Sequence, residues 1–141
     1  MRRICWDTML FIYLLEGNPA HGRRVRDILA ESYERNDYLC CSYLAVGEVM
    51  AGARWLGDSE KASIIQNKIK EMGFHFLPFD QGALLPFSQL RAKEKLRAAD
   101  AIHLACAASA GVDLFLTGDK QLTKRHVPGV KFIADIDNPL L

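Results

Sequence analysis

Five short apolar segments, separated by longer stretches with the period of an α-helix, run along this sequence of 141 residues. Most of the segments are continuously apolar, as expected of strands that are covered on both faces. Strands that alternate with helices predict parallel pairing through right-handed crossovers. We therefore expect an α/β fold with a central, mainly parallel sheet of about five strands and helices on both faces. The expected strands are Arg3–Trp6, Tyr38–Ser42, Phe74–Pro78, Asp113–Thr117 and Lys131–Ala134.

Capping residues indicate where three of the helices begin. Asn18-Pro19 predicts the start of one helix, Asp58 of a second and Asp80 of a third. Pro86 is expected to kink or delay the third helix. The expected buried faces are Val25, Ile28, Leu29 and Ser32 in the first, Ala62, Ile65, Ile69 and Met72 in the second, and Leu84, Phe87 and Leu90 in the third.

The composition fits one folded domain over residues 1–141. Half of the residues are hydrophobic, and 18 basic side chains stand against 17 acidic ones, which excludes a disordered chain and a polybasic tail. No apolar run approaches the roughly 18 residues of a membrane span, and no secretory signal is recognisable. Cys5, Cys40, Cys41 and Cys106 lack the spacing of a metal site and are expected to be buried free thiols. We therefore expect a cytoplasmic protein without a membrane partner.

Four acidic residues stand in apolar or small-residue surroundings. Asp7 ends the first expected strand and Asp119 follows the fourth, while Glu48 and Asp100 lie in expected helices, Asp100 in a first turn. In open parallel sheets ligands bind beyond the carboxyl ends of the strands, so we expect all four at that edge. Each has a simpler interpretation as well. The three aspartates would serve as helix caps, and Glu48 as a surface residue of an amphipathic helix.

Carboxylates grouped at one edge repel each other and require a cation. Two such charges about 4 Å apart repel by roughly 4 kcal/mol at an effective dielectric constant near 20. Carboxylates without a histidine or cysteine cage suit Mg²⁺, with Mn²⁺ as a substitute. Such ions activate water and neutralise charge on a phosphate. The residues alone therefore predict a metal-dependent phosphodiesterase or phosphatase.

The sequence resembles the PIN-domain family, and within it the VapC-type toxin ribonucleases, over nearly its whole length. The resemblance implies a three-layer α/β/α fold and an Mg²⁺ ion held by Asp7, Glu48 and Asp100, with Asp119 completing or supporting the site. It also implies an RNA substrate, a cognate antitoxin protein and a homodimer. The segments that carry it are Trp6-Asp7-Thr8, Val46-Gly47-Glu48-Val49, Ala99-Asp100-Ala101-Ile102-His103-Leu104-Ala105 and Leu116-Thr117-Gly118-Asp119.

The resulting hypothesis is an Mg²⁺-dependent endoribonuclease, the toxin of a type II toxin–antitoxin pair, which hydrolyses RNA phosphodiesters with a metal-activated water. Two alternatives stay open: a catalytically silent PIN-like domain that binds RNA or protein, and a non-toxin nuclease that processes RNA. A divalent-metal titration distinguishes the first alternative from an enzyme.

Several positions qualify the resemblance. The family commonly has a polar residue soon after the first aspartate and an asparagine before the last, where this chain has Met9 and Gly118. His103 is interpreted as a helix-packing histidine, with catalysis as the alternative. The basic segments 91–97 and 120–125 are interpreted as solvated surfaces, with contact to RNA phosphates as the alternative.

Overall fold

Strand β1 (Arg3–Trp6) is the centre of a five-stranded sheet in the computed structural model, which describes residues 1–55, 59–139 and 141. The other strands are β2 (Tyr38–Ser42), β3 (Phe74–Leu77), β4 (Leu114–Thr117) and β5 (Phe132–Asp135). Their order is β3-β2-β1-β4-β5, and every one of these pairings is parallel. This confirms the predicted α/β fold and its strands to within about one residue. Pro78 lies outside β3, since proline has no N–H to donate to a neighbouring strand.

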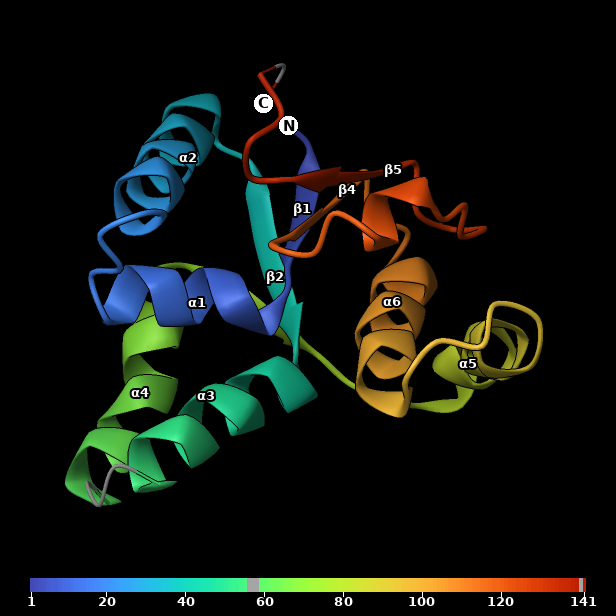
Figure 1. The fold of residues 1–141 in the computed structure, drawn as a ribbon, viewed down its shortest axis with the longest axis horizontal. Helices are drawn as coiled ribbons and strands as arrows, with labels where there is room; N and C mark the ends of the chain where they lie inside the picture. The colour runs from blue at the N-terminus through green and yellow to red at the C-terminus, as the bar shows by residue number, and fades with distance from the viewer. Residues whose placement is uncertain (56–58, 140) are drawn as a thin grey trace.

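Helices cover both faces of the sheet, which confirms the three-layer α/β/α architecture (Figure 1). Ile4 and Trp6 point into a core shared with α1 to α4, whereas Cys5 points into a core shared with α5 and α6. None of the helices in the described part of the chain has the length and apolarity to cross a membrane. The helices are α1 (Thr8–Leu15), α2 (Gly22–Arg35), α3 (Tyr43–Trp55), α4 (Ser59–Glu71), α5 (Gln81–Ala92) and α6 (Ala98–Ala110).

Helix α2 begins at Gly22 and not at Pro19, so the predicted start is wrong. The Asn18 side chain accepts hydrogen bonds from the backbone N–H of Ala20 and of His21, each at 2.9 Å. These bonds close a turn ahead of the helix, because asparagine satisfies nearby N–H groups in non-helical backbone. The predicted buried face of α2 is confirmed at all four of its positions.

Helix α5 starts where the sequence predicts, but its buried face differs. Asp80 caps it by accepting from the Gly82 N–H at 3.2 Å. Pro86 lies inside the helix, so the expected delay is wrong. Leu84 is exposed and Ala83 is buried in its place, which leaves an apolar side chain on the outer surface of α5. Asp58, the expected cap of α4, lies outside the described residues.

The four cysteines are buried and free, as predicted. Burial raises the pKa of Cys41, and it raises the pKa of Cys106 to about 11. Because the thiolate is the reactive form, these side chains serve as core residues.

Gly129 allows the segment before β5 to approach α6 closely. Its φ is 97°, and an added Cβ would lie 2.7 Å from the Ala108 carbonyl oxygen. Gly111, which ends α6, also has a positive φ of 65°, but a Cβ there would meet nothing within 4 Å.

Gly111→Ala is therefore expected to lower the free energy of unfolding by roughly 1 kcal/mol through backbone strain alone. We expect Gly129→Ala to cost a further 1–3 kcal/mol or so, because backbone must move. Urea unfolding of both variants measures this difference, and equal losses would contradict the close contact.

Candidate active site

All four acids singled out from the sequence line one cleft of about 560 Å³ at the carboxyl edge of the sheet. Asp7 follows β1, Glu48 lies in the middle of α3, Asp100 is in the first turn of α6, and Asp119 follows β4. Parallel pairing brings these segments together, because it directs the carboxyl ends of all strands to the same side. The structure thus brings all four residues together, while their roles stay a prediction.

Asp7 is the most buried of the four acids, with 8% of its surface exposed. It caps α1: its Oδ1 accepts from the Thr8 N–H at 2.8 Å, and its Oδ2 accepts from the Thr117 hydroxyl at 2.9 Å. Burial raises the pKa of Asp7, and the negative charge of Asp100 raises it further. His103 and the two hydrogen bonds oppose this rise. The capping interpretation is therefore correct for Asp7, yet a cap alone does not explain a carboxylate held at such an electrostatic cost.

Thr117, the last residue of β4, connects Asp7 with Asp119. Its hydroxyl donates to Asp7 and accepts from the Asp119 N–H at 3.0 Å. The Asp119 side chain is exposed and accepts from the Gln121 N–H at 2.9 Å. Asp119 therefore closes the turn that follows β4 while it lines the cleft. Gln121 occupies the capping position of the short 3-10 helix Leu122–Lys124 that comes next, so the interpretation of Asp119 as a helix cap is wrong.

Glu48 is half buried, and two donors from different elements hold it. The Thr8 hydroxyl donates to its Oε1 at 2.7 Å, and His103 Nε2 lies 2.8 Å from the same oxygen. His103 is itself buried and belongs to α6. The interpretation of Glu48 as a surface residue is therefore incomplete, because 38% of its side chain is exposed while protein partners hold one of its oxygens.

Asp100 pairs with Arg97 at the start of α6. The Arg97 Nε lies 3.2 Å from Asp100 Oδ2. Arg97 itself occupies the capping position, and Asp100 lies within the first turn, so the interpretation of Asp100 as the helix cap is wrong. The Arg97 side chain is 83% exposed, and such pairs contribute little to stability. The pair therefore leaves Asp100 accessible to another cation.

The donor set of the cleft fits a hard divalent cation. Carboxylate and hydroxyl oxygens are the ligands that Mg²⁺ and Mn²⁺ prefer. The second oxygens of Glu48, Asp100 and Asp119 accept no hydrogen bond from the described residues. As the side chains stand, no three Asp, Glu, His or Cys side chains in residues 1–55, 59–139 and 141 are grouped closely enough to enclose an ion. Their chemistry fits the cation, and binding would draw the carboxylates closer together.

Three residues around the acids make contacts in the site that the sequence did not indicate. His103 is a hydrogen-bonding partner of Glu48 and not a packing residue alone. Ser42 lies 2.7 Å from the other ring nitrogen of His103, and Arg97 pairs with Asp100. A serine that ends an apolar strand was the available signal for Ser42, but only the fold shows that α6 lies against it.

The two departures from the family pattern lie side by side. Met9 and Gly118 both line the cleft, together with Tyr13. A Cβ added at Gly118 would lie 3.7 Å from Met9 Cβ and 3.3 Å from the Tyr13 hydroxyl. A side chain at position 118 would therefore contact both residues, and the Tyr13 hydroxyl would have to move by a few tenths of an ångström.

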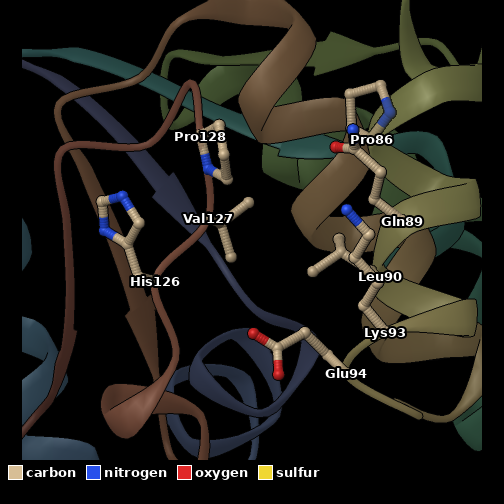
Figure 2. A pocket seen from close by; sticks show the side chains of 8 residues that line it. All are labelled: Pro86, Gln89, Leu90, Lys93, Glu94, His126, Val127 and Pro128. Atoms are coloured by element: carbon tan, nitrogen blue, oxygen red, sulfur yellow. The ribbon is translucent and has the colours of Figure 1, made fainter.

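A smaller hollow of about 180 Å³ separates α5 from the segment that precedes β5. Figure 2 shows Lys93 and Glu94 on one side of it and His126 on the other. The Arg125 guanidinium lies 2.9 Å from Glu94 Oε2 and joins the two sides. None of the four acids lines this hollow. The two segments that flank this hollow, 93–97 and 124–126, are rich in basic residues, and Arg97 of the first segment also lines the cleft. We call this set the basic border: Lys93, Lys95, Arg97, Lys124, Arg125 and His126.

Known proteins share this fold and parts of this sequence. A family profile described as the PIN domain matches residues 4–127. No curated protein sequence matches the chain.

Three solved structures illustrate the shared fold. The chain is similar to VapBC2 from Rickettsia felis bound to a DNA fragment from its promoter, with 12% identity, 94% of this chain and 98% of that chain covered, and a TM-score of 0.76. DNA-bound VapBC from Salmonella typhimurium has 20% identity, 96% and 99% coverage and a TM-score of 0.75. A toxin–antitoxin complex from Klebsiella pneumoniae has 24% identity, 90% and 94% coverage and a TM-score of 0.64. At these identities the likeness concerns the fold.

Asp7→Asn is expected to stabilise the metal-free protein. The raised pKa of Asp7 means that the folded state disfavours its charge, so wild-type stability falls as pH rises above the ordinary value of 3.8. Asparagine avoids this loss, and the gain in Tm should be larger at about pH 7.5 than at about pH 4.5. Each kcal/mol corresponds to roughly 3 °C in a domain of this size.

Asp113→Asn is the matched control for this prediction. The Arg3 N–H and the Lys131 ammonium group lower the pKa of Asp113, so removal of its charge should lower the Tm near neutral pH. Differential scanning fluorimetry of both variants without added metal provides the comparison. A lower Tm for Asp7→Asn at neutral pH would contradict the burial cost inferred here.

Proposed function

The chain belongs to the PIN domain family, and from this premise we propose that it is an Mg²⁺-dependent endoribonuclease and the toxin of a toxin–antitoxin pair. The observation that carries the proposal is the convergence of Asp7, Glu48, Asp100 and Asp119 on one cleft. They come from four separate segments of the chain, and only the fold brings them together. A structural role for each acid in its own segment does not require a shared cleft.

The ion would be held by Asp7, Glu48 and Asp100, with Asp119 completing or supporting the set. When bound, Mg²⁺ would activate a water molecule and neutralise charge on the scissile phosphate. Thr8 and Thr117 restrain the carboxylates of Glu48 and Asp7 by hydrogen bonds, which limits their movement on binding. Mn²⁺ prefers the same oxygen ligands and is expected to substitute.

The basic border supports RNA as the substrate. Its Arg97 lines the same cleft as the acids, so a strand that enters the cleft would pass this residue. Positive side chains beside a carboxylate cluster attract the phosphate backbone, which the acids alone would repel. Lys93, Lys95 and Lys124 are exposed and available for such contacts.

A protein partner is proposed from the similar structures. Those described above are complexes of the VapBC or toxin–antitoxin type. By analogy we infer that an antitoxin protein binds this chain, and we propose that it does so over the cleft. The homodimer stays a prediction from the family resemblance. Four free, buried cysteines are in keeping with a reducing cytoplasm as the compartment.

A catalytically silent binding domain is the second candidate. The pairing of Arg97 with Asp100 favours it, because an arginine beside a metal-binding carboxylate competes with the ion. The high exposure of that arginine weakens the competition. Cleavage and metal binding together distinguish the two candidates.

RNA cleavage by the purified chain is expected with Mg²⁺ or Mn²⁺ and not with EDTA. Asp100→Asn removes one carboxylate of the set and should lower the rate by about 100-fold or more, since even an outer-shell partner of a metal ligand contributes 10–100-fold or so. Product analysis should find 5′-phosphate and 3′-hydroxyl ends.

Asp80→Asn is the control, because Asp80 caps α5 and does not line the cleft, and asparagine is an equally good cap. Cleavage that persists both in EDTA and in Asp100→Asn would indicate a contaminant. A chain that neither cleaves RNA nor binds Mn²⁺ would favour the silent binding domain.

Removal of charge from the basic border is expected to weaken RNA binding without changing the chemistry. In Lys93→Ala/Lys124→Ala, KM for RNA should rise while kcat changes little. The slope of log(kcat/KM) against log[salt] should become shallower by about 0.7 for each lost phosphate contact. Arg23→Ala/Arg26→Ala removes the same charge from α2, which does not line the cleft, and should leave both quantities unchanged. Equal effects of the two double variants would indicate that RNA binding responds to the net charge of the protein and not to the basic border.

A further inference from the structure

A buried chain of hydrogen bonds runs from the backbone of α3 through α6 to the carboxylate of Glu48. The Ala45 N–H donates to Ser42 Oγ at 3.0 Å. Ser42 Oγ lies 2.7 Å from His103 Nδ1, and His103 Nε2 lies 2.8 Å from Glu48 Oε1. Ser42 and His103 are 1% and 3% exposed, so water does not replace these partners.

The hydrogen-bond donors along this chain determine the tautomer of His103. A carboxylate oxygen only accepts, so His103 Nε2 must supply the hydrogen to Glu48, and the Ser42 hydroxyl then donates to Nδ1 while its oxygen accepts from Ala45. The ring hydrogen then lies on Nε2, where it donates to Glu48. This assignment satisfies every polar group of the chain, as buried polar groups require.

Glu48 depends on these hydrogen bonds for its orientation. A glutamate side chain has several freely rotating bonds, and holding it in one orientation costs side-chain entropy. Gly47 and Gly52 have no side chains, and an added Cβ at either position would meet nothing within 4 Å. Packing at these two positions therefore does not restrain the Glu48 side chain. His103 and Thr8 both donate to Oε1, whereas Oε2 accepts no hydrogen bond from the described residues.

We propose that His103 is a positioning residue, which restrains one oxygen of Glu48 so that the other is presented to a divalent cation. Ser42 contributes by keeping the donor hydrogen on Nε2. The inference rests on the proposed function, since it takes Glu48 as a metal ligand. It goes beyond that function because it assigns a role to two residues outside the acidic set. A histidine that served only for packing would act equally well without a donor that reaches Glu48.

The test compares His103→Gln with His103→Asn. Counted along the side chain from Cα, the glutamine amide nitrogen lies as many bonds out as imidazole Nε2, while the asparagine amide nitrogen matches Nδ1. Glutamine therefore retains a donor for Glu48, whereas asparagine retains only a partner for Ser42. Both introduce a neutral amide at a buried site, so their effects on folding are comparable.

Mn²⁺ affinity of the RNA-free protein is the main readout, measured by titration calorimetry. His103→Asn should weaken binding by about 10–100-fold, and His103→Gln should stay within about threefold of wild type. Thermal unfolding of both variants without metal controls for folding. Equal affinities of the two variants would overturn the inference while leaving the nuclease proposal intact.

A second measurement does not depend on the metal. A long-range ¹H–¹⁵N spectrum of the metal-free wild type should show His103 with hydrogen on Nε2 and none on Nδ1. Ser42→Ala removes the partner of Nδ1 and should give a mixture of the two tautomers, with Mn²⁺ affinity between those of wild type and His103→Asn. A ring with hydrogen on Nδ1 and none on Nε2 in the wild type would overturn the inference whatever the metal result. A wild-type chain with the expected tautomer that binds no Mn²⁺ would overturn both the inference and the proposed metal site.

Discussion

The parallel pairing of β1 with both β2 and β4 is the constraint on which the rest of the structure depends. A strand paired in parallel on both sides must send its chain away through helices, and these helices cover both faces of the sheet. The same pairing places the residues after β1, β2 and β4 at one edge. Asp7, Ser42 and Thr117 therefore meet there although they are far apart in the sequence. The strand topology therefore determines where the cleft lies, and no single side chain does.

Burial and charge oppose each other at this edge. Asp7 follows the central strand of the sheet at a buried position, and Asp100 adds to the cost of its ionisation. Hydrogen bonds from Thr8 and Thr117 offset part of that cost. The proposed cation site is expected to have this character, because carboxylates that repel each other in the free protein are groups that an ion would bring together. Stability of the free protein is thus lower than the fold alone would allow.

The strands, the layers and the acids of the cleft were predictable because each leaves a local signal. Continuous apolar runs mark covered strands, and an acid at the end of such a run stands out from its surroundings. The partners of the acids leave no such signal. His103 resembles any histidine in a small-residue helix, and its bond to Glu48 exists only because α3 and α6 meet across the end of β2. Asn18 misled the prediction for a related reason, since its side chain satisfies either a helix or a turn and tertiary contacts decide between them.

Met9 and Gly118, adjacent in the cleft, also constrain how the sequence can change over evolutionary time. A larger residue at position 118 meets Met9 and Tyr13, so its effect depends on what occupies those positions. A Cβ at position 118 would make an ordinary van der Waals contact with Met9 and a tighter one, at 3.3 Å, with the Tyr13 hydroxyl, so Tyr13 is the side chain that must shift. Changes at position 118 are therefore expected to be non-additive with changes at positions 9 and 13, so that the cost of each change depends on which of the others is already present.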